Sequence, residues 1–244
     1  GENIKKYEEH FGEIKVARLR DSWRGWGGSY HRRLAEVYRF LVSPGQRVLE
    51  IGCGRGELLA SVAPARGLGV DFSSEMVTRA KSRHEALEFV HADAHDLSFI
   101  KETFDVIILS DLANDVWDVQ RVLEQIRPLC TPRTRVILNV YSNLWQTVLT
   151  LAQRLHLAAP MLEQNWLTAR DLRGMLNLAG FDVIRDWREI LFPLPIPLLA
   201  SFCNRILARL QDVRMITVRE GDRVLIGNSA AATLAHAQLL LEVG

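Results

Sequence analysis

The segment that most constrains the fold is VLEIGCGRG at residues 48–56, where an apolar run ends directly in three glycines at alternate positions. Glycine permits sharp turns with positive φ and places no Cβ atom in the way of a ligand. An amphipathic stretch, residues 57–62, follows at once. A strand, a glycine turn and a helix in this order are typical of a nucleotide-binding α/β sheet. A tight turn without a ligand is the alternative that the motif alone leaves open.

Short β-branched runs alternate with amphipathic stretches, which is the pattern of a parallel sheet covered by helices. We expect strands at residues 47–51, 67–70, 87–90, 104–109, 134–140 and 181–189, and a late hairpin of residues 215–218 and 223–226. We expect helices at residues 57–62, 74–84, 117–127, 144–157 and 168–178. Ser73 or Ser74 is a candidate cap for the second of these helices, and Thr168 for the last.

The regions outside this alternation suggest a main domain with two appendages. Residues 1–42 predict an N-terminal helical cap over the ligand edge of the sheet, residues 43–229 the main domain, and residues 230–244 a terminal helix or tail. Within the main domain, residues 187–212 are apolar and interrupted by prolines, which favours a core-packing insertion, with a lid or a lipid-facing surface as alternatives. The apolar run is too short for a bilayer, so we expect no transmembrane span, and peripheral membrane contact stays open.

Charge and cysteine content narrow the class of protein. Thirty Lys and Arg balance twenty-nine Asp and Glu, so a binder held to nucleic acid by charge alone is not expected. The three cysteines show no C-x-x-C spacing, which argues against a disulfide framework or a zinc cluster. We therefore expect a cytoplasmic protein without a bound metal; the oligomeric state cannot be read from the sequence.

Two acidic residues follow the next two strands. Asp71 comes 19 residues after Gly52, at the position where a carboxylate can accept both hydroxyls of an adenosine ribose. Asp93 follows the third strand and can accept a hydrogen bond from an adenine amino group, with the backbone amide of Ala94 beside it. The structural alternatives are that Asp71 only starts the following helix and that Asp93 belongs to a polar loop without a ligand.

Together these segments resemble the class I S-adenosylmethionine-dependent methyltransferases. The resemblance rests on Glu50-x-Gly-x-Gly-x-Gly, on GVDFS at residues 69–73 with Met76 beyond it, on Ala-Asp-Ala at residues 92–94, and on the strand FDVII at residues 104–108. It implies a Rossmann-like α/β fold with a seven-stranded, mostly parallel sheet of order 3-2-1-4-5-7-6, helices on both faces, and S-adenosyl-L-methionine as cofactor, converted to S-adenosyl-L-homocysteine. The cofactor-binding residues that it implies are Glu50, Gly52, Cys53, Gly54, Gly56, Asp71, Phe72, Met76, Asp93, Ala94 and Ser110.

The expected activity is methyl transfer to a small-molecule, sugar or lipid-like acceptor, with oxygen as the leading methylated atom. The residues proposed for catalysis are Asp111, Asn114 and His31, with Tyr30, Asp115, Tyr141 and Asn143 as further candidates to orient the acceptor. Each can instead cap a helix or lie on a solvated face. The chain also resembles methyltransferase modules found ahead of bacterial polyprenyl-phosphate-type glycosyltransferases. A non-catalytic cofactor-binding module, a nicotinamide-dependent oxidoreductase and an RNA or protein methyltransferase are the alternatives.

Overall fold

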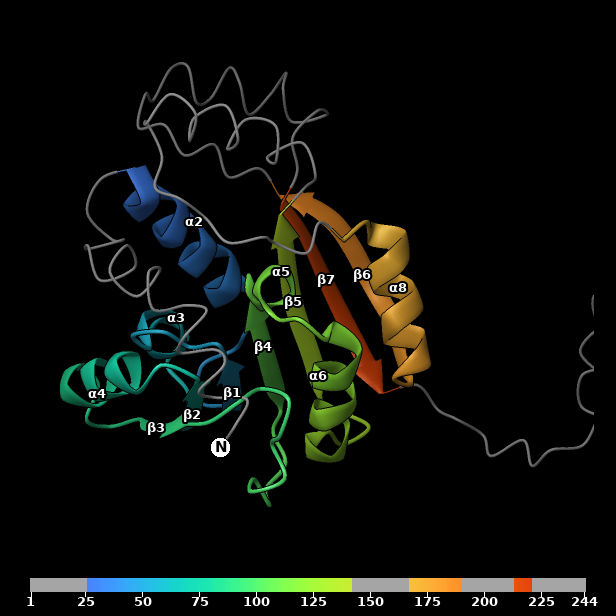
Figure 1. The fold of residues 1–244 in the computed structure, drawn as a ribbon. Helices are drawn as coiled ribbons and strands as arrows, with labels where there is room; N and C mark the ends of the chain where they lie inside the picture. The colour runs from blue at the N-terminus through green and yellow to red at the C-terminus, as the bar shows by residue number, and fades with distance from the viewer. Residues whose placement is uncertain (1–25, 142–166, 190–212, 221–244) are drawn as a thin grey trace, which may run out of the picture.

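The protein is built around one seven-stranded sheet of order β3-β2-β1-β4-β5-β7-β6 (Figure 1). The computed structural model describes residues 26–141, 167–189 and 213–220. The strands are β1 Arg47–Ile51, β2 Arg66–Asp71, β3 Glu88–His91, β4 Val106–Ser110, β5 Arg135–Tyr141, β6 Phe181–Glu189 and β7 Val213–Glu220. The pairs among β1 to β5 are parallel, and β7 runs antiparallel to both β5 and β6. The predicted fold class and strand order are confirmed.

Helices cover both faces of the sheet. They are α2 Trp26–Leu41, α3 Glu57–Ser61, α4 Ser74–Arg83, α5 Leu112–Asp115, α6 Val119–Ile126 and α8 Ala169–Leu178, with a 3₁₀ turn at Arg127–Leu129. Two local predictions about their first turns are confirmed. Ser73 caps α4 by accepting the backbone N–H of Met76, and Thr168 forms a reciprocal capping box with Asp171 at the start of α8.

Side chains alternate between the two faces along each central strand, which divides the core into two apolar clusters. On one face, Val48, Ile108 and Ile137 pack beneath α2, α3 and α4. On the other face, Leu49 and Ile107 belong to the cluster that α5, α6 and α8 complete. Parallel strands buried on both faces explain why their sequences read as continuous apolar runs.

Helix α2 is part of this core. Its buried side chains recur at helical spacing and are Leu34, Ala35, Val37 and Tyr38. They lie in the same cluster as the strand residues Ile108 and Ile137. The backbone carbonyl of Leu41, at the end of the helix, accepts a hydrogen bond from the Arg135 guanidinium at the start of β5. The second half of α2 is therefore fixed against the centre of the sheet.

Three elements differ most from the sequence-based expectation, and the first is the short helix α5, which the sequence analysis did not expect. The helix expected at residues 117–127 begins at Val119, because Asp118 caps it by accepting the backbone N–H of Arg121, and it passes into the 3₁₀ turn at Arg127. The late hairpin is wrong: β7 lies between β5 and β6, so both of its edges are already paired. The expected strand at residues 215–218 lies within β7, and its expected partner at residues 223–226 lies outside the described residues.

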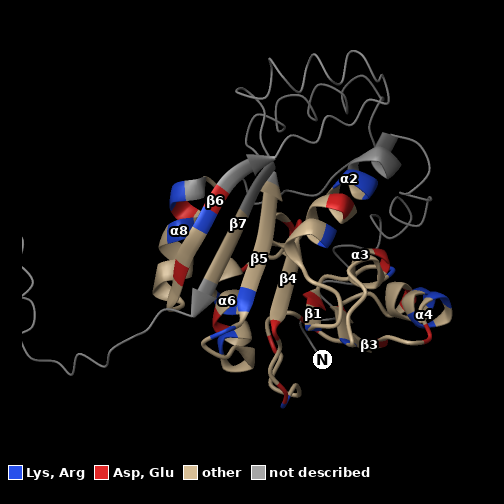
Figure 2. Cartoon of the chain, turned by 180° about the vertical axis from the view of Figure 1, so that it is seen from behind, with Lys and Arg blue, Asp and Glu red and all other residues tan. Residues whose placement is uncertain are grey.

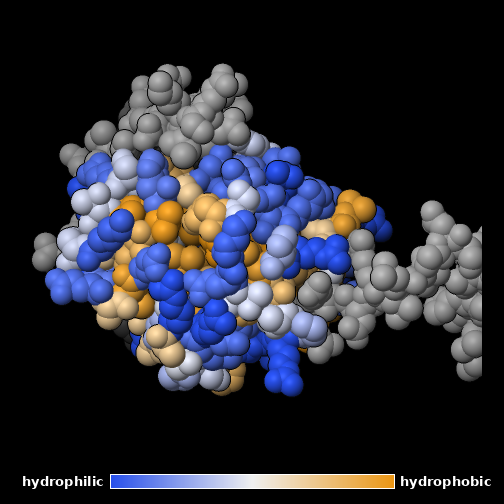
Figure 3. All heavy atoms as spheres, turned by 90° about the horizontal axis from the view of Figure 1, so that it is seen from below, coloured by the Kyte–Doolittle hydropathy of each residue, from blue (hydrophilic) through white to orange (hydrophobic). Residues whose placement is uncertain are grey.

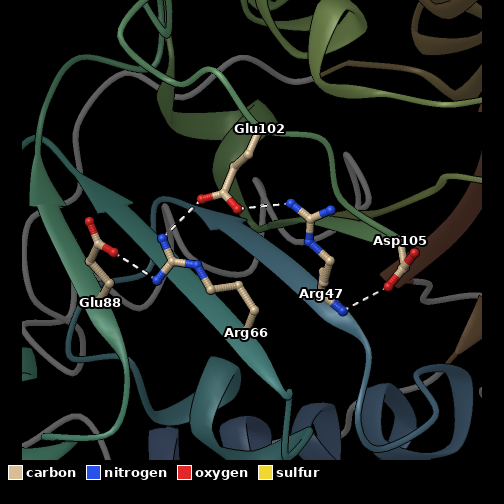
Figure 4. A network of polar contacts seen from close by, with 5 residues as sticks. All are labelled: Arg47, Arg66, Glu88, Glu102 and Asp105. Atoms are coloured by element: carbon tan, nitrogen blue, oxygen red, sulfur yellow. Dashed lines mark hydrogen bonds and ion pairs between the residues drawn. The ribbon is translucent and has the colours of Figure 1, made fainter.

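The amino-terminal ends of β1 and β2 lie at one edge of the sheet, and a network of charged side chains covers this edge (Figure 4). Glu102 bridges Arg47 and Arg66, each at 2.9 Å, and Arg66 also pairs with Glu88 at 2.7 Å. The hydrogen bond from Arg66 lowers the pKa of the Glu102 carboxyl. Seen from below, this end shows mainly hydrophilic residues with apolar ones between them (Figure 3). Its side chains are partly solvated, so the network adds only modestly to stability.

Several predicted segments lie outside the described residues: the first part of the N-terminal cap, the helix at residues 144–157, most of the apolar segment at residues 187–212, and the tail at residues 230–244. Among the helices that are described, none is long and apolar enough to cross a membrane.

Candidate functional site

The ends of β1, β2 and β3 are tied together by backbone hydrogen bonds. The amides of Gly52 and Cys53 both donate to the carbonyl of Val70, at 2.8 and 3.1 Å. The carbonyl of the next residue, Asp71, accepts the N–H of Ala92 at 3.0 Å. The glycine turn, the acid after β2 and the loop after β3 therefore meet at one edge of the sheet. In open α/β sheets this carboxyl edge is where ligands bind.

The three glycines of the turn have positive φ angles but different surroundings. A Cβ atom on Gly52 would lie 2.8 Å from Leu112 Cδ1, and one on Gly56 would lie 2.5 Å from the Phe89 ring. A Cβ atom on Gly54 would meet no atom of the described residues within 4 Å. Packing thus explains Gly52 and Gly56, whereas Gly54 borders open space that a ligand can occupy.

Asp71 joins the turn to the following helix. Its Oδ2 accepts the N–H of Gly54 at 2.7 Å, and its Oδ1 accepts the N–H of Ser73 at 2.9 Å. The residue is 7% exposed, so the carboxylate is held at the edge of the open space beside Gly54. Each carboxylate oxygen has two lone pairs and can accept a second hydrogen bond.

Glu50 is an almost fully buried acid at the end of β1. Burial raises its pKa to about 8, with the nearby Asp71 adding to the rise and a backbone hydrogen bond from Leu59 opposing it. Within the described part of the chain, its Oε2 atom has no hydrogen-bond partner. A buried, unsatisfied carboxyl oxygen is costly, and at a functional site it indicates a polar or cationic ligand group.

Asp93 pairs with a residue that the sequence analysis did not assign to the site. Its Oδ1 accepts the backbone N–H of His95 at 2.9 Å and lies 2.6 Å from His95 Nδ1. Although burial acts in the opposite direction, these hydrogen bonds hold the pKa of the Asp93 carboxyl below its usual range. The ring of His95 stacks on Trp117, with centroids 4.8 Å apart. An aromatic wall therefore stands beside Asp93.

Asp111 begins the turn that follows β4. It has a φ of 58°, and although it occupies the N-cap position of α5 its side chain makes no capping hydrogen bond. A left-handed conformation at a non-glycine residue costs energy and is concentrated at functional sites. The Asp111 Oδ1 instead accepts a short hydrogen bond from Asn139 Nδ2. Because Gly52 contacts Leu112, Asp111 adjoins the glycine turn.

The remaining predicted residues are distributed around this edge. The Cys53 side chain is buried beside Gly69, its thiol lies 3.9 Å from the Gly54 carbonyl, and burial raises the pKa of the thiol. Met76 is buried, Phe72 and Ala94 are half-buried, and the Phe72 carbonyl lies 2.7 Å from His91 Nε2. Asn114 is 1% exposed within α5.

His31 lies on α2, seven residues before Tyr38 and on the same side of the helix, since seven residues make nearly two turns. It is half-buried. The further candidates Tyr30, Tyr141 and Asn143 have side chains outside the described part of the structure. Among the residues that are described, no group of three or more His, Cys, Asp and Glu side chains is placed to hold a metal ion.

The sequence analysis missed two polar residues behind Asp111. Asn139, on β5, and Tyr38, on α2, are both fully buried, and the Tyr38 hydroxyl donates to Asn139 Oδ1 at 2.8 Å. The available signal was a single amide in the otherwise apolar run VILNV. A polar side chain at such a position needs a partner, because burial without one is costly.

Comparison with known proteins gives the family. The model of a family described as "Methyltransferase domain" matches residues 26–186, which is more than half of the chain. A demethylmenaquinone methyltransferase of Oceanobacillus iheyensis is 26% identical over 176 residues, or 60% of this chain and 74% of that protein. One from Bacillus cereus is 31% identical over 106 residues, which cover 39% of this chain and 45% of the relative.

Solved structures share the fold. The magnesium protoporphyrin IX methyltransferase of Synechocystis, with S-adenosylhomocysteine bound, has a TM-score of 0.63 at 16% identity and covers 89% of this chain and 99% of its own. An S-adenosylmethionine-dependent methyltransferase of Mesorhizobium loti has a TM-score of 0.61 at 16% identity and covers 80% of this chain and 100% of its own. The open space at Gly54 and the unsatisfied Glu50 oxygen fit S-adenosylmethionine as the cofactor. Fold, site and family match together identify the chain as a member of the class I S-adenosylmethionine-dependent methyltransferases.

Proposed function

We propose that the chain transfers the methyl group of S-adenosylmethionine to an oxygen atom of a small, lipid-like or sugar-like acceptor. The observation that carries this proposal is the placement of Asp111. Its carboxylate follows β4, adjoins the glycine turn through the Gly52–Leu112 contact, and takes no part in capping a helix. A carboxylate there can orient an acceptor hydroxyl and take its proton.

For the cofactor we propose the following division of roles. Gly54 leaves room for the ligand, and the backbone of the turn from Gly52 through Cys53 to Gly56 lines it. Asp71 accepts hydrogen bonds from the ribose hydroxyls, while Glu50 offers a carboxyl to the cationic part. Asp93 and the backbone amide of Ala94 receive the adenine. Phe72, Met76 and Ser110 complete the lining.

When bound, S-adenosylmethionine would supply a methyl group carried on a sulfonium. A nucleophile can attack this methyl carbon directly. Asp111 would orient the acceptor hydroxyl toward that methyl carbon and take its proton, and S-adenosylhomocysteine would leave as the neutral thioether. Positioning and exclusion of water provide most of the rate in such a displacement. The buried Asn114 and the half-buried His31 are further candidates for orienting the acceptor.

Two observations support a small acceptor. Acidic and basic residues are interspersed along the described helices (Figure 2), which does not favour a long polyanion as the acceptor. Two relatives with similar sequence or fold are named for methylating demethylmenaquinone and magnesium protoporphyrin IX. An RNA or protein acceptor is the alternative outcome of the test.

The test supplies methyl-labelled S-adenosylmethionine to the purified protein together with a cell extract, which is then separated into small-molecule, lipid, RNA and protein fractions. The expected result is label in the small-molecule or lipid fraction as a methyl ether or ester, greatly reduced with Asp111→Asn. Label confined to RNA or protein would contradict the proposed acceptor class.

A further inference from the structure

A chain of buried side chains connects the N-terminal helix α2 to the carboxylate after β4. The Tyr38 hydroxyl donates to Asn139 Oδ1 at 2.8 Å, and Asn139 Nδ2 donates to Asp111 Oδ1. These residues come from α2, β5 and the turn after β4, and 101 positions separate Tyr38 from Asn139. None of the roles proposed above for the cofactor uses Tyr38 or Asn139.

The sheet register places this chain at the functional edge. Asn139 on β5 pairs with Ser110 on β4, the residue immediately before Asp111. Side chains alternate along β5, and Ile137 belongs to the cluster under α2, so Asn139 points to the same face. The Tyr38 hydroxyl therefore lies where β4 and β5 approach the acceptor side.

Burial means that the polar groups of Tyr38 and Asn139 must be hydrogen-bonded within the protein. Tyr38 and Asn139 are both 0% exposed. A buried amide or hydroxyl is costly unless it is hydrogen-bonded, and apolar side chains would fill the same space without this requirement. A fully satisfied polar network in a core holds its members in one arrangement.

The chemistry of the amide gives the network a direction. An asparagine has one accepting oxygen and one donating nitrogen, and a flip of the group exchanges them. Because the Asp111 carboxylate can only accept, the Asn139 nitrogen is turned toward it, which leaves the amide oxygen to accept from the Tyr38 hydroxyl. Without that hydroxyl, the buried amide oxygen would have lost its donor, and the amide would lose the contact that holds it from the side of α2.

We infer that Tyr38 and Asn139 are positioning residues: Tyr38 fixes the amide of Asn139, and Asn139 holds the Asp111 carboxylate in place at the acceptor side. The inference rests on the proposed role of Asp111. It gives α2 a part in turnover that is separate from its packing against the sheet.

The test compares Tyr38→Phe with Val37→Ala, a control that removes buried volume from the neighbouring residue of the same helix. Tyr38→Phe is expected to lower kcat about tenfold while the KM for S-adenosylmethionine stays within about twofold. Tyr38→Phe in an Asp111→Asn background is expected to add less than about twofold, because both changes act through one carboxylate. Val37→Ala should leave kcat close to that of the wild type.

A spectroscopic readout checks the contact without turnover. The side-chain amide signal of Asn139, assigned by its loss in Asn139→Leu, should be protected from solvent exchange in the wild type and in Val37→Ala. It should shift and lose protection in Tyr38→Phe. An unchanged amide signal, or full additivity of Tyr38→Phe and Asp111→Asn, would overturn the inference and leave the proposed function standing. Unchanged kcat in Asp111→Asn itself would overturn both.

Discussion

The carboxylate of Asp71 accepts a hydrogen bond from the backbone N–H of Gly54 at 2.7 Å. This contact joins the acid after β2 to the one glycine of the turn that borders open space. The same carboxylate also accepts the N–H of Ser73 at the start of α4. Asp71 therefore shapes the glycine turn in addition to the ribose contact that we propose for it.

We expect Asp71→Ala to weaken S-adenosylhomocysteine binding by about 1 to 3 kcal/mol, because a charged hydrogen-bond acceptor is lost and the turn loses its anchor. Isothermal titration calorimetry measures this. Asp182→Ala removes an exposed carboxylate on β6 and is the matched control, with wild-type affinity expected. Equal affinity for both variants would remove the assigned role of Asp71.

Two glycine substitutions should separate binding from folding. Gly54→Ala adds a methyl group in open space, at a cost of about 1 kcal/mol for its left-handed φ, and should abolish most cofactor binding. Gly56→Ala drives a methyl group into the Phe89 ring and should lower the free energy of unfolding by about 2 to 4 kcal/mol in total. Denaturant unfolding and calorimetry on both variants check the contrast. The reverse pattern would show that Gly54 serves packing.

Glu50 should make the stability of the cofactor-free protein depend on pH. Its folded pKa of about 8 exceeds the ordinary 4.5, so the folded state binds the proton more tightly than the unfolded state does. The free energy of unfolding should therefore fall as pH rises from about 4.5 to about 8 and then level off, by an amount on the order of a few kcal/mol.

Glu50→Gln should lack this component of the pH dependence and be more stable than the wild type near pH 8. The measurement is urea unfolding at several pH values, with Glu75→Gln as the control because Glu75 forms only a partly exposed pair with Arg79. If the free energy of unfolding of Glu50→Gln falls with rising pH as much as that of the wild type, the role assigned to Glu50 is wrong.

Asp111→Asn should reduce turnover by more than it reduces cofactor affinity, because the amide keeps the shape but cannot take a proton. Labelled methyl transfer gives kcat and calorimetry gives the Kd for the cofactor. Parallel losses in both quantities would assign Asp111 a structural role.

Local signals predicted most of the fold. Strands β1 and β6 have the bounds expected from their apolar runs, and Thr168 caps α8 as its side chain suggested. The start of α6 was misplaced because Asp118, two residues into the expected helix, is the residue that caps it. The late hairpin failed because strand pairing is decided by the whole sheet: β7 inserts between β5 and β6.

The residues of the candidate site likewise fall into those that the sequence could predict and those that it could not. Asp71 and the glycine turn could be found because the contacts that join them follow from strand order. Tyr38 and Asn139 could not, since their hydrogen bond depends on where α2 crosses the sheet, and neither a Tyr in an amphipathic helix nor a single Asn in an apolar strand identifies its partner. The stacking of His95 on Trp117 depends likewise on the packing of two loops.

The most direct test of the central claim is a crystal structure of the protein grown with S-adenosylhomocysteine. We predict density for the ligand beside Gly54, with the ribose hydroxyls within hydrogen-bond distance of the Asp71 carboxylate and the adenine next to Asp93. Ligand density elsewhere, or side chains filling the space beside Gly54, would contradict the account.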